Sequence, residues 1–256
     1  MLAIGVYECV DWPCYFLVYN VLTNLMVKDN VRSIRERISL ICSRLNRNPD
    51  SVTIIAVSKG RTVEQIKEAI DVGLTDIGEN KVQEAVVKYN AIRNSEYAQR
   101  IKWHMVGHLQ TNKVKEAVNI FELIQSVDSI RLAQEIDKQA AKINKIQDIL
   151  IEVKTSPEAT KFGFGPNDAI EAIKEIANFK SIRLRGLMTI APIVDNLEKT
   201  RPYFRKLKEL RDEIHKFGIL NLEFTILSMG MTDDFEQAIE EGSTMVRLGR
   251  AIFETS

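Results

Sequence analysis

Strand-like and helix-like segments alternate along most of this sequence, and this alternation restricts the fold more than any other feature. Short apolar runs rich in β-branched residues are separated by longer stretches with apolar residues at helical spacing. Strands joined through helices pair in parallel, so the pattern predicts an α/β protein with a parallel sheet. The strands are expected at residues 52–57, 76–78, 101–106, 123–126, 149–153, 184–189, 223–227 and 244–248. The helices are expected at residues 28–45, 63–72, 80–89, 112–118, 129–144, 167–178, 200–217 and 232–241.

The number of strand–helix units indicates how the sheet closes. Eight units in a chain of 256 residues favour a single (β/α)8 barrel of the TIM type. A doubly wound open sheet is the alternative, but it usually carries a glycine-rich fingerprint after its first strand. The first strand here is followed by "VSKGRT", which lacks that pattern. No linker interrupts the sequence after Met26, so we predict one barrel domain over residues 26–256.

The first 25 residues do not fit the barrel pattern. They are apolar but contain Glu8, Asp11 and Pro13, and the apolar run at residues 13–26 is too short to span a bilayer. No basic segment precedes that run, which argues against a secretory signal. Because a regular amphipathic helix follows Met26, we predict that residues 1–25 are a non-native or mobile extension.

Charge and composition argue against several classes of protein. Lys and Arg together number 35, as do Asp and Glu, so neither nucleic acid nor an anionic membrane is favoured as a partner. We expect a cytoplasmic globular protein. The three cysteines fit no zinc spacing, and His104 and His108 fall in a strand followed by a glycine turn, not on one helix face. No metal site is predicted.

A lysine ends the first predicted strand. In "TIIAVSKGRT" an apolar, β-branched run leads directly to Lys59, and Gly60 and Arg61 then break the pattern. The simplest explanation of one such lysine is a solvated surface charge. In a barrel, however, ligand residues lie at the C-terminal ends of the strands. Lysine also suits Schiff-base chemistry, because burial lowers its pKa.

The ends of the last two strands carry the residues of an anion site. Ser228, Gly230 and Thr232 follow the seventh strand, and Gly249 and Arg250 follow the eighth. Barrel phosphate sites are commonly built from these two loops, where glycines admit backbone N–H groups close to an anion. Taken singly, the glycines are explained as turn residues. Taken together with their strand positions, these residues predict a phosphate site.

A lysine opposite a phosphate site matches pyridoxal 5′-phosphate, which has an aldehyde at one end and a phosphate at the other. Arg247, in the last strand, is the candidate for the group that faces the pyridine nitrogen. Because arginine cannot accept a proton there, the nitrogen would stay neutral and the ring would be a weak electron sink. The alternative is a structural arginine that pairs with an acidic neighbour such as Glu79.

Several longer motifs follow one another in order. They are "AVSKGRT", "IGENKVQE", "WHMVGHLQTNK", "QSVDS", "KFGF", "GLMTIAP" and "LSMGMTDDFEQAIEEGSTMVRLGRAIF". In this order they resemble the pyridoxal-phosphate homeostasis protein family (YggS/PROSC type) from about residue 31 to residue 253. That family is similar in fold to the N-terminal barrel of alanine racemase, the fold type III class of pyridoxal-phosphate proteins. The resemblance implies a role in vitamin B6 homeostasis and amino-acid metabolism.

The resemblance also implies roles for single residues. It implies that Lys59 holds the cofactor as a Schiff base and that His104 is a positioning residue near the floor of the site. The sequence departs from the family at Glu152 and Lys154, where members often carry Gln and Asn. The residues implied to lie near the cofactor are Asn80, Met188, Ser228, Met229, Gly230, Arg247, Gly249 and Arg250.

The sequence lacks the second base of a racemase. Alanine racemase uses a lysine and a tyrosine that a partner's second domain supplies, whereas none of the six tyrosines here ends a predicted strand. We therefore assign no catalytic residue and expect a monomeric carrier that passes pyridoxal phosphate to apo-enzymes. Two alternatives stay open: a slow racemase-like enzyme that uses Lys59 as its base, and a scaffold whose partner surface matters more than its ligand.

Overall fold

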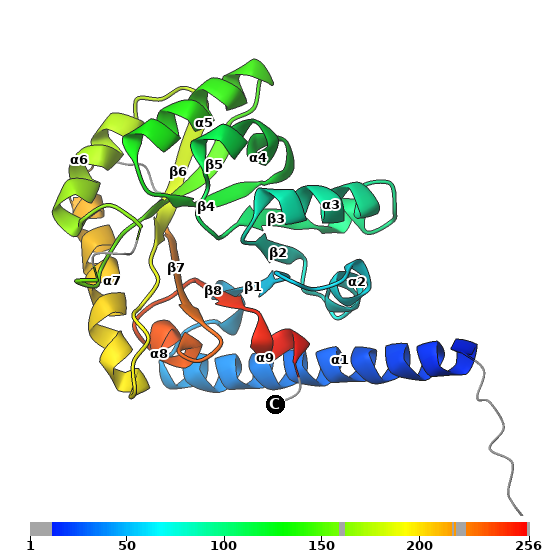
Figure 1. The fold of residues 1–256 in the computed structure, drawn as a ribbon. Helices are drawn as coiled ribbons and strands as arrows, with labels where there is room; N and C mark the ends of the chain where they lie inside the picture. The colour runs from blue at the N-terminus through cyan, green and yellow to red at the C-terminus, as the bar shows by residue number, and fades with distance from the viewer. Residues whose placement is uncertain (1–11, 159–161, 217, 219–223, 255–256) are drawn as a thin grey trace, which may run out of the picture.

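The computed structural model describes residues 12–158, 162–216, 218 and 224–254, and it contains a closed barrel of eight parallel strands. The strands follow one another around the barrel in chain order, and β8 pairs with β1 to close it (Figure 1). The predicted (β/α)8 barrel is therefore confirmed. The strands are β1 Thr53–Val57, β2 Asp76–Glu79, β3 Lys102–Met105, β4 Leu123–Val127, β5 Gln147–Glu152, β6 Ile182–Met188, β7 Ile226–Met231 and β8 Met245–Leu248.

Helices surround the barrel and connect its strands (Figure 1). Local capping explains where some of them begin: Thr62 and Gln65 form a capping box at the start of α2, and the Ser129 hydroxyl accepts a hydrogen bond from the Leu132 N–H at the start of α5. In the described ranges, no helix is both long and apolar enough to span a membrane. The helices are α1 Trp12–Arg44, α2 Val63–Asp71, α3 Val82–Ile92, α4 Val114–Ile120, α5 Ile130–Lys142, α6 Pro166–Ile176, α7 Arg201–Lys216, α8 Phe235–Glu240 and α9 Arg250–Phe253.

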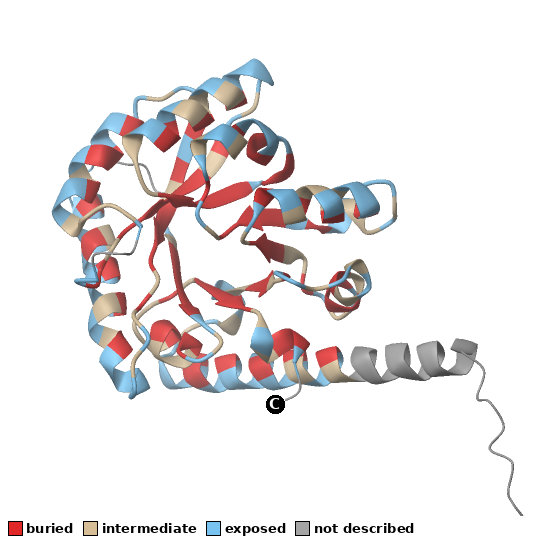
Figure 2. Ribbon diagram, viewed as in Figure 1, coloured by how far each residue is buried: buried red, intermediate tan, exposed pale blue. Residues whose placement is uncertain are grey.

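Alternate residues of each strand face two different environments. Ile55, Leu150 and Met188 belong to a small apolar cluster inside the barrel. Their neighbours, such as Ala56 and Leu187, pack in the larger cluster between the strands and the helices. Figure 2 shows the strands largely buried and the helices buried mainly on the side that faces them. Since side chains alternate along a strand, this pattern identifies which residues near the strand ends point into the mouth of the barrel.

The long helix α1 covers α8 and α9 (Figure 1). It buries an apolar stripe made of Val31, Ile34, Ile38 and Ile41, at the helical spacing that the sequence predicts. The helix begins at Trp12 and therefore passes without a break through the expected boundary at Met26. Residues 1–11 lie outside the described residues, so the N-terminal extension stays a prediction.

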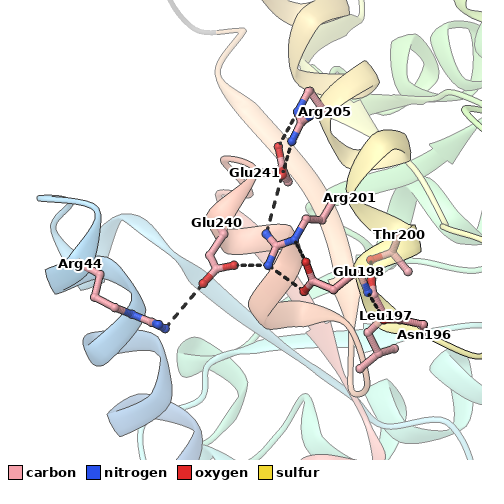
Figure 3. Close-up of polar contacts among 9 residues, drawn as sticks. All are labelled: Arg44, Asn196, Leu197, Glu198, Thr200, Arg201, Arg205, Glu240 and Glu241. Atoms are coloured by element: carbon pink, nitrogen blue, oxygen red, sulfur yellow. Dashed lines mark hydrogen bonds and ion pairs between the residues drawn. The ribbon is translucent and has the colours of Figure 1, made fainter.

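A cluster of charges joins α1, α7 and α8 on the outside of the barrel (Figure 3). The Arg201 guanidinium lies 2.7 Å from Glu198 Oε2, 2.5 Å from Glu240 Oε2 and 3.7 Å from Glu241 Oε1. Glu240 in turn lies 3.6 Å from the Arg44 guanidinium of α1. These contacts link helices that are far apart in the sequence.

Some predicted boundaries were wrong. The seventh strand is Ile226–Met231, not residues 223–227. The backbone of "SMGM" continues the strand through Gly230, and Met231 still pairs with Arg247 of β8. The helix after it begins at Phe235, not at Thr232, because the Asp234 side chain accepts a hydrogen bond from the Met231 N–H over 2.7 Å and closes a turn first. Likewise α6 is Pro166–Ile176, not residues 167–178.

Candidate functional site

A cavity of about 250 Å³ opens at the C-terminal ends of the strands, and it contains four of the predicted site residues. It lies where the barrel fold places ligands. A larger groove, about 940 Å³, runs along the outside of α1 beside the end of α2 and contains no strand end. The smaller cavity is therefore the candidate site. Its walls are Val57, Asn80, Val106, Ile190, Met231, Thr232, Asp233, Arg247, Gly249 and Arg250.

Lys59 lies in the turn that follows β1 and is exposed. Ile55 and Val57 face the barrel interior, and β1 ends at Val57 before the turn that carries Lys59. Val57 lines the cavity, two residues before the lysine. On the other side of Lys59, the Gly60 N–H donates to Glu84 Oε1 over 3.1 Å. Lys59 itself is not among the residues that line the cavity, and the turn that carries it is held by Glu84 of α3.

A buried ion pair holds the residue before Lys59. Lys88 Nζ donates to Glu79 Oε1 over 2.6 Å and to the Ser58 carbonyl over 2.6 Å, and the Ser58 hydroxyl donates to Glu79 Oε1 over 2.5 Å. All three residues are buried. Glu79 therefore pairs with Lys88, and the alternative pairing of Arg247 with Glu79 is wrong.

Arg247 is buried, and its guanidinium is held inside the barrel by uncharged partners. Nη1 donates to Ser228 Oγ over 2.6 Å, and Nη2 donates to the Thr189 carbonyl over 2.8 Å. Burial lowers the pKa of Arg247 to about 10, against the opposing charges of Glu152 and Asp234. The side chain is therefore a cation at neutral pH, and it forms part of the cavity wall.

Four of the predicted residues lie behind the cavity and not in its wall. Ser228 is buried and bonded to both Gln125 and Arg247, and Met188 packs in the interior apolar cluster. Met229 faces the opposite side of β7 and packs in the outer core. Gly230 has φ +92°, and a Cβ there would lie 2.5 Å from the Ala238 Cβ, so this glycine is needed where α8 crosses the strand end.

The loops after β7 and β8 meet at the side of the cavity where the sequence predicts a phosphate. Gly249 precedes α9, and both Gly249 and Arg250 line the cavity. Thr232 also lines it, and its hydroxyl accepts a hydrogen bond from the Ala251 N–H over 3.4 Å. The Arg250 guanidinium lies 2.6 Å from Asp233 Oδ2. One hydroxyl residue, one arginine and the Asp233 carboxylate that pairs with it therefore line this side of the cavity.

Asn80 forms the wall at the end of β2. Its Oδ1 is buried and has no hydrogen-bond partner among the described residues. Gly107 lies against it so closely that a Cβ at position 107 would collide with the Asn80 backbone. A buried amide oxygen without a donor is costly, so this position suits a ligand that brings one.

Glu152 is a titratable group that the sequence prediction of the site left out. It is the last residue of β5 and lies two positions after Leu150, which faces the interior. Burial and the charge of Asp128 raise the pKa of Glu152 to about 7, while Arg247 opposes the shift. The departure from the family at this position was its only signal in the sequence.

His104 is buried on β3, and both of its ring nitrogens have hydrogen-bond partners. Its Nε2 lies 3.0 Å from Asp76 Oδ1, and its Nδ1 lies 3.2 Å from Gln125 Nε2. Over the described residues, no group of three His, Cys, Asp or Glu side chains is arranged to hold a metal ion.

Comparison with known proteins places the chain among proteins of similar length. Residues 30–256 match the family model "Alanine racemase, N-terminal domain". The pyridoxal phosphate homeostasis protein of Aquifex aeolicus is 42% identical over 225 residues, which are 88% of this chain and 96% of that protein. The protein of the same name from Escherichia coli K12 is 34% identical over 231 residues, or 89% and 95% of the two chains.

Solved structures agree with this relationship. PipY of Synechococcus elongatus, determined with pyridoxal phosphate bound, is 34% identical and has a TM-score of 0.75 over 86% of this chain and 99% of its own. Alanine racemase of Clostridium difficile shares the fold, with 18% identity and a TM-score of 0.69 over 89% of this chain and 57% of its own. The chain therefore belongs to the pyridoxal phosphate homeostasis protein family, which is built on the alanine racemase N-terminal barrel.

Proposed function

We propose that the chain binds pyridoxal 5′-phosphate in the mouth of the barrel and serves in the homeostasis of this cofactor. The observation that carries the proposal is the placement of Lys59 and Arg247. The lysine lies in the turn after β1, two residues beyond Val57 of the cavity wall, and the buried arginine forms part of that wall. The family relationship and the pyridoxal phosphate bound to PipY support this assignment.

The residues of the cavity fit the parts of this cofactor. We propose Lys59 as the amine that holds the aldehyde and Arg247 as the group that faces the pyridine nitrogen. Gly249, Arg250 and Thr232 would hold the phosphate, since they line the side of the cavity that the loops after β7 and β8 form. The unpartnered oxygen of Asn80 suits a donor of the ligand.

In this proposal, the predicted residues that lie behind the cavity wall stabilise the residues that form it. Ser228 would act on the site by holding Arg247, and Gly230 by allowing the turn after β7. Met188 would close the interior below the site, whereas Met229 acts from the outer face of β7.

The same residues favour storage of the cofactor over catalysis. When bound, pyridoxal phosphate supplies an aldehyde that condenses with amines and a ring that withdraws electrons. Arg247 is a cation that cannot take up a proton, so beside the ring nitrogen it would leave that nitrogen unprotonated and the electron withdrawal weak. No tyrosine stands among the residues that line the cavity in the described part of the chain. We therefore propose a cytoplasmic, monomeric carrier that passes the cofactor to apo-enzymes.

A titration followed by visible absorbance tests the binding proposal. Pyridoxal phosphate is added to the wild type, to Lys59→Ala and to the control Lys154→Ala, which removes a half-buried lysine just after β5. We expect a new visible band in the wild type and the control and its loss in Lys59→Ala. A band of equal strength in Lys59→Ala would show that another amine holds the aldehyde.

A slow racemase-like activity is the second candidate, because Glu152 adds an acid with a pKa of about 7 near the mouth. Exchange of the Cα hydrogen for deuterium, measured over a panel of amino acids, separates the two functions. A carrier gives exchange no faster than free cofactor. Exchange that is faster, and that Lys59→Ala abolishes, would establish the enzyme.

A further inference from the structure

A line of polar side chains crosses the interior of the barrel below the candidate site. It contains one residue from each of five strands: Asp76, His104, Gln125, Ser228 and Arg247. Four hydrogen bonds join them, at 3.0, 3.2, 2.6 and 2.6 Å from Asp76 to Arg247. Gln125 and Ser228 are completely buried, and His104 and Arg247 nearly so. Burying polar groups costs desolvation free energy that apolar side chains in the same place would avoid. A connected line of buried polar side chains is therefore expected to have a role.

The two ends of the line lie at opposite ends of the barrel. Asp76 is the first residue of β2 and lines a cleft of about 320 Å³ with Thr53, the first residue of β1. Arg247 is the third residue of β8 and lines the cavity at the barrel mouth. A carboxylate at one end of the barrel is thus connected to a guanidinium at the other. Asp76 Oδ1 lies 3.0 Å from His104 Nε2, and its Oδ2 accepts a hydrogen bond from the Thr75 hydroxyl over 3.2 Å.

The chemistry of the groups gives the line one direction. Arg247 can only donate, so Ser228 Oγ accepts from it and has its own hydrogen free for Gln125 Oε1. The amide nitrogen of Gln125 then faces His104 Nδ1, which must be the unprotonated nitrogen. His104 Nε2 therefore carries the hydrogen and donates it to Asp76. Every donor points away from Arg247, toward the carboxylate.

If the donors pointed from Asp76 toward Arg247, the hydrogen of the Ser228 hydroxyl would have no acceptor on the line. If His104 were protonated on both nitrogens, Gln125 would have to turn its oxygen to Nδ1 and its amide nitrogen to Ser228. Ser228 would then receive two donors, and its own hydrogen would have no acceptor on this line. Met245 Sδ, which now lies 3.2 Å from Gln125 Nε2, would face the amide oxygen as well.

We propose that Asp76, His104 and Gln125 are positioning residues for Arg247, acting through Ser228 and requiring the neutral Nε2–H form of His104. The line gives the buried guanidinium an uncharged hydrogen-bond partner, Ser228, while Arg247 forms part of the cavity wall. The part of this proposal that concerns the cofactor rests on the proposed function. The part that concerns the hydrogen bonds stands without it.

Nitrogen-15 NMR of the cofactor-free protein tests the direction of the line. The chain has three histidines, so His108 and His215 serve as internal references. We expect neutral His104 with hydrogen on Nε2. In Gln125→Glu the carboxylate accepts from both Ser228 and His104, so His104 should become doubly protonated at the same pH while His215 keeps its signals. A wild-type His104 that is doubly protonated, or that carries hydrogen on Nδ1, would overturn the proposal.

Gln125→Met tests the connection to Arg247. The substitution keeps the approximate volume of the side chain and removes its hydrogen bonds to His104 and Ser228. Gln147→Met is the matched control: Gln147 is a completely buried glutamine of β5 whose amide donates to the Phe121, Glu122 and Asp148 carbonyls. In cofactor-free protein the guanidinium nitrogen signals of Arg247 should shift in Gln125→Met and stay in place in the control. Unchanged Arg247 signals would refute the connection, whether or not the protein binds pyridoxal phosphate.

Cofactor affinity gives the functional readout. We expect Gln125→Met to raise the dissociation constant of pyridoxal phosphate about tenfold, and Asp76→Asn about threefold, as the loss of one or two hydrogen bonds predicts. Asp76 lines no part of the mouth cavity, so an effect there is transmitted along the line. Equal affinities for the wild type and both variants would contradict the positioning role.

Discussion

Lys88 Nζ and Glu79 Oε1 form a buried ion pair 2.6 Å apart, and the same ammonium donates to the carbonyl of the residue that precedes Lys59. The pair joins α3 to the end of β2 and reaches the turn of the candidate cofactor lysine. Breaking a buried pair leaves one charge without compensation, which costs more than the pair itself contributes.

Lys88→Met should therefore lower the free energy of unfolding by about 3–5 kcal/mol, because Glu79 loses its charged partner inside the protein. Urea unfolding measures this change. Lys174→Met, which removes the exposed partner of Glu171, is the control and should change stability by less than about 1 kcal/mol. Similar effects of the two substitutions would mean that the Lys88 pair is not buried in solution.

Glu152→Gln should change how stability depends on pH. The pKa of Glu152 rises from 4.5 to about 7 on folding. Its contribution to the free energy of unfolding is therefore present below pH 4.5, is lost as the pH rises to about 7, and stays lost above pH 7. The free energy of unfolding of the variant should exceed that of the wild type by up to about 3 kcal/mol at pH 8 and by little at pH 5. Unfolding at several pH values measures this difference, with the exposed Glu171→Gln as control. Parallel curves for Glu152→Gln and the wild type would refute the raised pKa.

Gly230→Ala should destabilise the turn between β7 and α8. The backbone at Gly230 has φ +92°, and the new Cβ would lie 2.5 Å from the Ala238 Cβ and 3.0 Å from the Phe235 Cα. Strain and overpacking together predict a loss of about 2–5 kcal/mol. Gly218→Ala, also at positive φ but in open space, should cost only about 1 kcal/mol. Thermal unfolding compares the two, and equal losses would argue against the close contact.

The ion pairs that Arg201 forms with Glu198, Glu240 and Glu241 should contribute little to the free energy of unfolding, and this contribution should decrease as the salt concentration rises. A double-mutant cycle of Arg201→Ala and Glu240→Ala should give a coupling of about 1 kcal/mol at low ionic strength that decreases in 1 M salt. The reason is that both side chains are partly exposed, although their oxygen and nitrogen atoms lie 2.5 Å apart. A coupling that salt leaves unchanged would indicate a dry, buried pair.

The barrel and the approximate positions of its strands were predictable because apolar periodicity is a local property of the sequence, although the end of the seventh strand was not. Gly249 and Arg250 were predicted from their positions after a strand, and both line the cavity, whereas Lys59 lies in the turn after β1 and its part in the site stays a prediction. Met229 was grouped with Ser228, although neighbouring residues of a strand face opposite sides, and the structure places it in the outer core. A stricter use of the period-two rule would have separated these two residues.

Other features depend on contacts between distant parts of the chain. Gln125 and Ser228 are 103 positions apart, and nothing in either segment indicates that they are hydrogen bonded. The raised pKa of Glu152 likewise depends on burial in the closed barrel and on Asp128 at the end of the neighbouring strand. The partner of Glu79 was missed because Lys88 looks like an ordinary charged residue on the surface of a helix.

Peptide mapping after borohydride reduction tests the central claim most directly. The protein is loaded with pyridoxal phosphate, reduced, digested and analysed by mass spectrometry for the lysine that retains the cofactor. The account predicts that the modified peptide contains Lys59, and that Lys154→Ala gives the same peptide. A modification confined to another lysine, or no modification in protein that has taken up the cofactor, would contradict it.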